Sequence, residues 1–110
     1  MAQVGAMDTL TRLEMTIASR MGADPETSYV ASLNAKGLSK MAQKLGEEAV
    51  EAAIAAVSGS REELVGESAD LLMHLTVLLR AKGIALSDVM AELDRREGTS
   101  GLTEKENRSR

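Results

Sequence analysis

The chain of 110 residues contains no cysteine, no tryptophan and no phenylalanine, and it has only one tyrosine and one proline. The absence of cysteine excludes disulfides, thiolate metal sites and thiol nucleophiles. The scarcity of aromatic residues leaves Leu, Val, Ile, Met and Ala to fill the core, and these residues pack well in helices. With a single proline, almost nothing interrupts long helices. The composition therefore favours one small all-α domain.

Charge and hydropathy exclude several kinds of partner. The net charge is −4 at pH 7, so the overall field does not attract the chain to nucleic acid or to an acidic membrane surface. The longest apolar run, "LLMHLTVLL", is far shorter than the ~20 residues that cross a bilayer. The first residues lack the charged and apolar regions of a signal peptide. We therefore expect a cytoplasmic protein.

Apolar periodicity and capping signals predict five helices joined by short connections. Asp24 is expected to cap the second helix, Ser60 with Glu63 to form a capping box on the fourth, and Ser87 to cap the fifth. Gly59 is expected to end the third helix. The expected helices span about residues 7–21, 25–36, 38–58, 61–81 and 87–97, in a domain of residues 1–97 followed by a loosely held tail of residues 98–110. We predict an all-α helical bundle with antiparallel central helices.

Two apolar surfaces bear on how the bundle is assembled. The fourth helix is apolar on nearly every side from Leu71 to Leu79, so it should lie centrally and contact two neighbours, one of which another subunit can supply. A chain of this length also leaves its burial incomplete as a monomer. The third helix should face the core with a single stripe made of Leu38, Met41, Leu45, Ala49, Ala52 and Ala56.

Two acidic pairs occur in consecutive helices. Glu48 and Glu51 share one face of the third helix, and Glu67 and Asp70 share one face of the fourth. Because the chain reverses at "SG", the helices should be antiparallel and the pairs can lie opposite one another. Such like charges need compensation, and an all-oxygen ligand set favours Mg²⁺, with Mn²⁺ as a substitute. A di-iron carboxylate bundle would need two Glu-x-x-His units, and His74 is the only histidine.

A row of lysines adds positive charge beside the acidic residues. Lys36, Lys40 and Lys44 step by four toward Glu48, although Gly37 can break the row after Lys36. Lysines beside a magnesium-filled acidic cluster would suit a polyphosphate. Each signal also has a simpler explanation when taken singly. "EEAVE" and "ESAD" are typical of solvated helix faces, Lys40 and Lys44 of a surface pair, and His74 of a hydrogen-bonded core residue.

The spacing of the acidic pairs resembles the signature of the all-α nucleoside triphosphate pyrophosphatase superfamily, in which "ExxE" is followed by "ExxD". Within it the chain resembles the phosphoribosyl-ATP pyrophosphatase family over most of its length. The matching stretches are "SYVASLNAKGLSKMAQKLGEEAVEAAIAAV", "REELVGESADLLMHLTVLL" and "KGIALSDVMAELDRREG". Asn34 departs from the family pattern, which has an apolar residue there.

The resemblance implies Mg²⁺-dependent hydrolysis of phosphoribosyl-ATP to phosphoribosyl-AMP and pyrophosphate, the second step of histidine biosynthesis. It also implies a homodimer or higher homo-oligomer, with a separate cyclohydrolase as the partner enzyme for the next step. The implied metal ligands are Glu48, Glu51, Glu67 and Asp70. Glu47 is implied as a further ligand or as the group that orients and deprotonates water, and Lys40, Lys44 and His74 are implied as residues that bind the phosphate or the substrate.

Two other functions stay open at this point. The first is a housekeeping pyrophosphatase of the same superfamily that acts on nucleoside triphosphates. The second is a non-catalytic helical oligomerisation module. Turnover of phosphoribosyl-ATP compared with ATP separates the enzymatic alternatives, and the absence of any turnover would favour the module.

Overall fold

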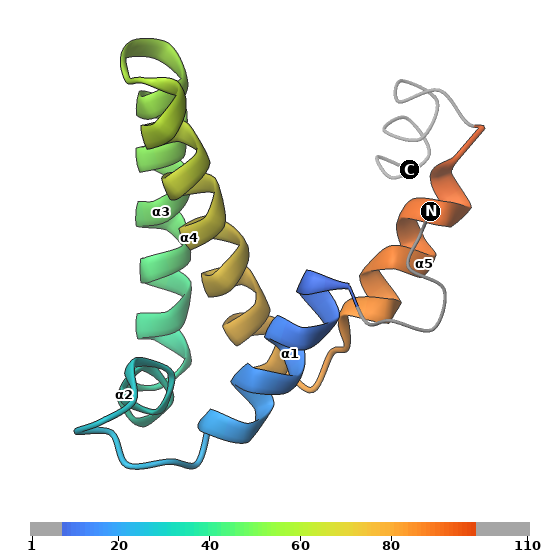
Figure 1. Ribbon diagram of the computed structural model, residues 1–110. Coiled ribbons are helices and arrows are strands. Elements are labelled where there is room, and N and C mark those ends of the chain that lie inside the picture. The colour runs from blue at the N-terminus through green and yellow to red at the C-terminus, as the bar shows by residue number, and fades with distance from the viewer. Residues whose placement is uncertain (1–7, 99–110) are drawn as a thin grey trace.

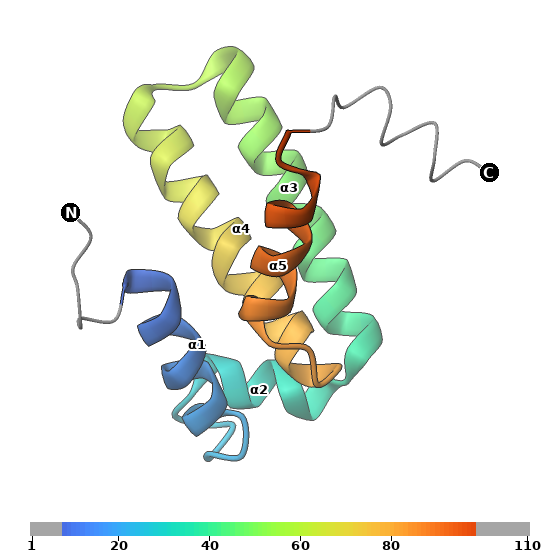
Figure 2. The ribbon, with the colours of Figure 1, turned by 90° about the vertical axis from the view of Figure 1, so that its right-hand side faces the viewer.

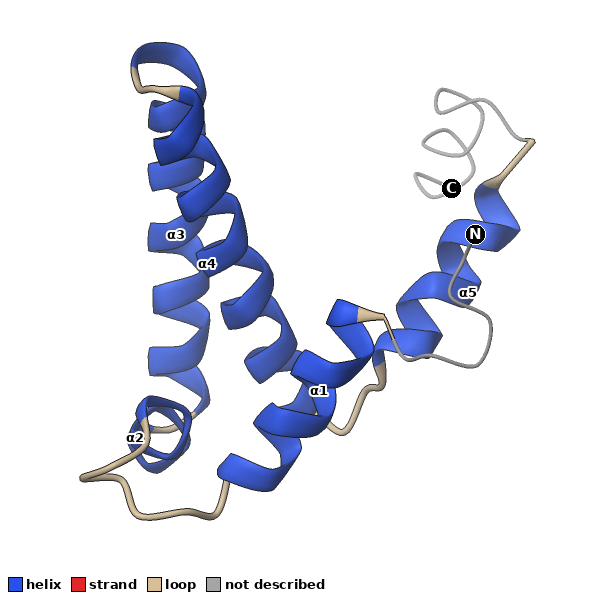
Figure 3. Ribbon diagram, viewed as in Figure 1, coloured by secondary structure: helices blue, strands red, loops and turns tan. Residues whose placement is uncertain are grey.

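The computed structural model describes residues 8–98, and this part of the chain contains helices and no strands (Figure 3). The helices are α1 Thr9–Arg20, α2 Tyr29–Lys36, α3 Leu38–Ser58, α4 Arg61–Ala81 and α5 Leu86–Arg96. They confirm the expected all-α fold. The expected helix start at Met7 and the expected tail, apart from Gly98, lie outside the described residues. Within residues 8–98, no helix has the length and apolar character needed to cross a membrane.

The long helices α3 and α4 form an antiparallel hairpin and lie side by side in both Figure 1 and Figure 2. At the turn, the Gly59 amide donates to the Ala55 carbonyl at 2.9 Å. The Glu63 amide donates to Ser60 Oγ at 3.1 Å, and the Ser60 amide donates to Glu63 Oε1 at 2.7 Å, which completes a capping box. A Cβ at position 59 would lie 2.7 Å from Glu63 Oε1, so glycine leaves room for this cap. The predicted bounds of both helices are confirmed.

The hydrophobic core lies at the end of the hairpin far from this turn. There α1 packs against α4, and α2 packs against α3 and α1 (Figure 1). The central side chains are Ile17, Leu33, Met41 and Val77, surrounded by Leu13, Met21, Val30, Met73 and Leu78. The prediction that α4 contacts two neighbours is confirmed within one chain, since α4 packs against both α3 and α1. A contact of α4 with another subunit stays a prediction. The core therefore holds the hairpin at one end only.

The predicted apolar stripe of α3 is wrong in part. Leu38, Ala49 and Ala56 are exposed, whereas the residues that α3 buries are Met41, Glu48 and Ala55. These three positions repeat every seven residues, which is the spacing that two helices use when they pack nearly parallel or antiparallel. The contact with α4 therefore rotates α3 away from the predicted stripe. As a consequence, a glutamate occupies the middle of the packing face.

The predicted start of α2 is also wrong. Asp24 does not cap this helix, because its Oδ1 accepts the Glu26 amide at 2.9 Å and its carbonyl oxygen accepts the Ser28 amide at 3.0 Å in a preceding turn. The cap is Ser28, whose Oγ accepts the Ala31 amide at 3.2 Å. The helix therefore begins at Tyr29.

The polar residue Asn34 has a structural reason of its own. Its side-chain amide donates to the Met21 carbonyl at the end of α1, at 2.9 Å. The last turn of α1 has carbonyls without partners inside the helix, so this bond satisfies one of them. Asn34 therefore joins α1 to α2, which an apolar residue at this position could not do.

The start of α5 depends on α1 rather than on Ser87. The helix begins at Leu86, one residue before the predicted cap, and the Leu86 amide donates to Glu14 Oε2 at 2.7 Å. The Ala85 amide donates to Asp88 Oδ2 at 3.3 Å. A carboxylate from a distant helix thus takes the role expected of the serine hydroxyl. Figure 1 shows α5 leading away from the hairpin, beyond α1.

We predict that Glu14→Ala loosens the first turn of α5. Losing a cap costs about 1 kcal/mol, so amide hydrogen exchange at residue 86 and the next turn should speed up about fivefold. Glu14→Gln retains an acceptor oxygen and should have a smaller effect. Ser87→Ala is the matched control, because its hydroxyl caps nothing in this arrangement. Faster exchange in Ser87→Ala than in Glu14→Ala would contradict the assignment.

Candidate active site

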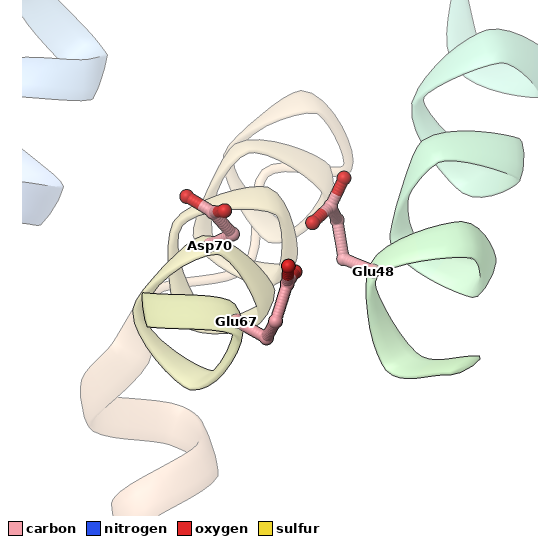
Figure 4. A group of neighbouring side chains, drawn as sticks. All are labelled: Glu48, Glu67 and Asp70. Atoms are coloured by element: carbon pink, nitrogen blue, oxygen red, sulfur yellow. The ribbon is translucent and has the colours of Figure 1, made fainter. Parts of the chain in front are cut away.

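Three carboxylates from the two long helices converge between them. Glu48 projects from α3, and Glu67 and Asp70 project from α4, so that one oxygen of each lies within 4.8 Å of the others (Figure 4). The antiparallel packing that the sequence predicted brings these side chains together from both acidic pairs, in a register that the sequence left open. All of the donor atoms are carboxylate oxygens, which hard divalent cations prefer. The three residues could therefore hold a metal ion.

Glu48 is the most buried member of the group. It is only 7% exposed, because it lies on the face of α3 that packs against α4. Lys44 lies one turn earlier, with its Nζ 4.0 Å from Glu48 Oε2. A buried carboxylate needs a partner of opposite charge, and a single lysine at this distance compensates one charge incompletely.

Glu67 has the most unfavourable surroundings. Its Oε1 atom is buried and has no hydrogen-bond partner in the described structure. Loss of hydration raises the pKa of Glu67, and the nearby carboxyl group of Glu51 raises it further, followed by Glu48 and Asp70. A buried oxygen without a donor, surrounded by like charges, fits a bound cation. The residues present therefore fit the divalent metal that the sequence suggested.

Glu51, the remaining expected ligand, lies at the edge of the group. It is exposed and is not one of the three residues whose oxygens converge, although its carboxyl group acts on Glu67. Both residues line a cavity of about 330 Å³ that extends toward the turn of the hairpin. The cavity is lined by Glu51, Ile54, Ala55, Ser58, Gly59, Glu63 and Glu67. Glu51 could thus reach a cation from the open side of the site.

Glu47 lies outside the converging group and forms a surface network with its neighbours. Its Oε1 is 3.2 Å from Lys44 Nζ, and its Oε2 accepts a hydrogen bond from Gln43 Nε2 at 2.9 Å. The bond from Gln43 and then the bond from Lys44 lower the pKa of Glu47, so it is ionised at neutral pH. Lys44 therefore connects Glu47 with Glu48 through its single ammonium group.

The predicted row of lysines is broken where the chain turns. Lys36 is the last residue of α2. The next residue, Gly37, adopts a φ of 98°, and this change of direction separates Lys36 from Lys40 and Lys44 on α3. A positive φ of this kind favours glycine. Two lysines thus remain on the helix that contributes Glu48, and both are half-buried.

His74 is held by hydrogen bonds at both ring nitrogens and is only 5% exposed. Its Nδ1 lies 2.8 Å from the Asp70 carbonyl oxygen, and its Nε2 lies 2.8 Å from the Tyr29 hydroxyl. Because a carbonyl oxygen only accepts, Nδ1 carries the proton, and in the neutral ring Nε2 then accepts from Tyr29. His74 is therefore a hydrogen-bonded core residue, which is the simpler of the two interpretations that the sequence allowed. Through His74, the Tyr29 hydroxyl is connected to the backbone of Asp70, one of the three converging residues. The sequence had indicated no role for Tyr29.

Known proteins resemble this chain over nearly its whole length. The model of the phosphoribosyl-ATP pyrophosphohydrolase family matches residues 10–97. The phosphoribosyl-ATP pyrophosphatase of Erythrobacter litoralis is 68% identical over 102 residues, which cover 93% of this chain and 98% of that protein. The enzyme of the same name from Rhizorhabdus wittichii is 66% identical over 97 residues, or 88% of this chain and 92% of that one. A third, from Novosphingobium aromaticivorans, is 62% identical over 102 residues, or 93% and 95% of the two chains.

The family match includes α3, α4 and the three converging carboxylates, and the relatives cover the same helices. The chain belongs to the phosphoribosyl-ATP pyrophosphohydrolase family.

Proposed function

We propose that this protein hydrolyses phosphoribosyl-ATP to phosphoribosyl-AMP and pyrophosphate, the second step of histidine biosynthesis, with Mg²⁺ as its cofactor. The observation that carries the proposal is the convergence of Glu48, Glu67 and Asp70 in a chain of this family. One oxygen of this group, Glu67 Oε1, is buried without a hydrogen-bond donor in the described structure. The product phosphoribosyl-AMP would pass to a cyclohydrolase. We also propose that the protein acts in the cytoplasm, where nucleotides are made.

The metal ligands in this proposal are Glu48, Glu67 and Asp70, with Glu51 as a fourth from the open side. Carboxylate oxygens suit Mg²⁺, which is commonly shared between protein carboxylates and substrate phosphates, and Mn²⁺ accepts the same ligands. When bound, Mg²⁺ supplies positive charge to the phosphate oxygens and lowers the pKa of a bound water molecule. The protein itself supplies a fixed arrangement of oxygens, since the ligands come from two helices packed against each other.

The lysines and Glu47 would handle the phosphate and the proton. Lys44 Nζ, now 3.2 Å from Glu47 and 4.0 Å from Glu48, can turn toward a phosphate oxygen, with Lys40 one turn away. Once Lys44 moves, Glu47 loses one of the two bonds that lower its pKa and becomes a better base. A water oxygen then bonds to a phosphorus of the anhydride while the bond to the bridging oxygen breaks. The water proton passes to Glu47, and pyrophosphate leaves.

We predict that the purified protein with Mg²⁺ releases pyrophosphate from phosphoribosyl-ATP at least tenfold faster, by kcat/KM, than from ATP or dCTP. A factor of ten corresponds to about 1.4 kcal/mol of additional binding, which contacts with the extra phosphoribosyl group can supply. A coupled pyrophosphate assay with and without EDTA measures both the specificity and the metal requirement. Equal rates on all three nucleotides would favour the housekeeping pyrophosphatase, and no turnover on any would favour the non-catalytic module.

A second prediction concerns the charge of the acidic group. Glu67→Gln removes a negative charge from the cluster, so the metal-free protein should melt at the same or a higher temperature. Mg²⁺ should raise the melting temperature of the wild type but not of this variant. Mutating a residue that only hydrogen-bonds to a metal ligand already lowers metal affinity or activity about 10- to 100-fold. The loss of a ligand itself should therefore lower kcat/KM at least that far.

The matched control is Glu62→Gln, which makes the same change in the first turn of α4, away from the cluster. It should keep both the activity and the response to Mg²⁺. Thermal melts at several Mg²⁺ concentrations, together with the pyrophosphate assay, give both readouts. A Glu67→Gln protein that retains wild-type activity and stabilisation by Mg²⁺ would show that Glu67 is not a ligand.

We further propose that the protein assembles as a homodimer or a higher homo-oligomer through the uncovered faces of the hairpin. Beyond the core, α3 exposes Val50, Ile54 and Val57, the last of which is 88% exposed. On the adjoining helix α4, Val65 and Leu72 are also exposed. Exposed apolar side chains on two neighbouring helices are typical of an interface, and identical chains commonly pair about a two-fold axis.

We predict that Ile54→Lys shifts the assembly toward monomer at micromolar concentration, because it would bury a charge in the interface. Size-exclusion chromatography with light scattering measures the mass. Met15→Lys is the control, since Met15 is equally exposed but lies on α1. A monomeric wild type, or dissociation by Met15→Lys instead, would contradict this interface.

A further inference from the structure

Tyr29 is the only aromatic residue of the chain, and its position is unusual for a lone aromatic side chain. It is the first residue of α2 and remains 49% exposed, although large rings usually bury most of their surface. The ring therefore presents an apolar surface to solvent without contributing its full area to the core.

The orientation of this ring is fixed by a buried residue of another helix. The Tyr29 hydroxyl donates to His74 Nε2 at 2.8 Å, and the two rings meet nearly at right angles, 81° apart with centroids 5.6 Å from each other. His74 is in turn fixed by its bond to the Asp70 carbonyl. The tyrosine ring is thus pre-oriented at low cost in conformational freedom, which favours binding.

Two hydrogen bonds connect the Tyr29 hydroxyl to the backbone of Asp70, a proposed metal ligand. The charges of the site act on it as well. Partial loss of hydration raises the pKa of Tyr29, Lys44 lowers it, and Glu48 and Asp70 raise it again. The hydrogen bonds through His74 therefore connect the ring to the backbone of Asp70, and its hydroxyl is within electrostatic range of the acidic group and of Lys44.

A purely structural role would need only the hydroxyl, which joins α2 to α4 through His74. The exposed part of the ring has no function in that role. Next to a phosphate site, an exposed aromatic ring is suited to a nucleobase, because every base has a flat face that stacks on aromatic side chains. The cavity on the turn side of the cluster contains three carboxylates and no aromatic residue, so it offers no comparable surface.

We propose that the adenine base of the nucleotide substrate stacks on Tyr29, which His74 holds in place. The inference rests on the proposed function and adds to it the direction in which the nucleotide lies. The nucleoside would extend toward the start of α2, on the side of Lys44, and the open cavity toward the turn would not contain the base. Tyr29 is then a substrate-binding residue, and His74 is a positioning residue that acts through it.

A single tyrosine makes this arrangement directly observable by NMR, since protein labelled with ¹³C-tyrosine gives one set of ring signals. The probes are phosphoribosyl-AMP with Mg²⁺ and, separately, inorganic pyrophosphate with Mg²⁺. We expect the nucleotide to shift the ring signals and to show nuclear Overhauser effects between adenine protons and the Tyr29 ring, and pyrophosphate to show no such effects. Contacts from adenine to Ile54 or Ala55 in the cavity, or no contact to Tyr29, would overturn the inference.

Kinetics of two variants separate the ring from the hydroxyl. Tyr29→Leu should raise KM for phosphoribosyl-ATP by roughly 5- to 150-fold, the range for loss of a stacked base, with a smaller change in kcat. Tyr29→Phe keeps the ring but loses the bond to His74, so its KM should rise less than that of Tyr29→Leu. Met15→Ala is the control, since it removes a similarly exposed apolar side chain from α1 and should leave KM unchanged. Circular dichroism melts confirm that each variant is folded.

Equal impairment of Tyr29→Phe and Tyr29→Leu would mean that only the bond to His74 matters, and this would overturn the stacking role. The proposed function is tested separately by pyrophosphate release from phosphoribosyl-ATP. A wild type that is active while its tyrosine signals ignore the nucleotide leaves the proposed function standing and removes this inference. A wild type without that activity removes the proposed function itself.

Discussion

Repulsion among carboxylates is the constraint on which the arrangement of the hairpin depends. Glu48 lies at the centre of the face that joins α3 to α4, where an apolar residue would stabilise the packing, and Glu67 and Asp70 oppose it. These charges push the helices apart at their midpoint. The helices are held together on both sides of them, by the short connection of Gly59 and Ser60 at the turn and by the hydrophobic core at the other end. The site therefore lies between two regions that each favour the closed hairpin.

This placement explains both why the acidic group destabilises the hairpin and why the group can bind a cation. Sites that bind charged ligands commonly break the rules that make the rest of a fold stable, and the remainder of the structure compensates. Here the buried Glu67 oxygen has no donor in the described protein, so a cation would improve the stability of the fold and complete the site in one step. Because the carboxylates come from two different helices, a cation would also bind those helices to each other.

Local sequence signals were sufficient to predict the hairpin but not the contacts that orient its surroundings. Ser60, Glu63 and Gly59 lie close together in sequence, so their capping interactions could be predicted, and with them the antiparallel approach of the acidic pairs. The α5 cap comes from Glu14, 72 residues away, and the partner of His74 is 45 residues away. Such pairings depend on tertiary packing, which no local pattern encodes. The same packing rotated α3 by placing Glu48, rather than Ala49, against α4.

The acidic group lies close to the exposed apolar residues that we propose as the interface between subunits. The core covers one half of the hairpin, and the acidic group lies where that cover ends, so its other side is open toward Ile54 and the cavity. A second copy placed over the exposed valines and Ile54 would remove water from this side. Since charges interact more strongly where water is excluded, the same contact would strengthen both the repulsion among the carboxylates and their attraction for a cation. Under the proposed function, assembly would therefore make the site depend more strongly on its metal, while Tyr29 at the opposite side would leave a path for the nucleotide.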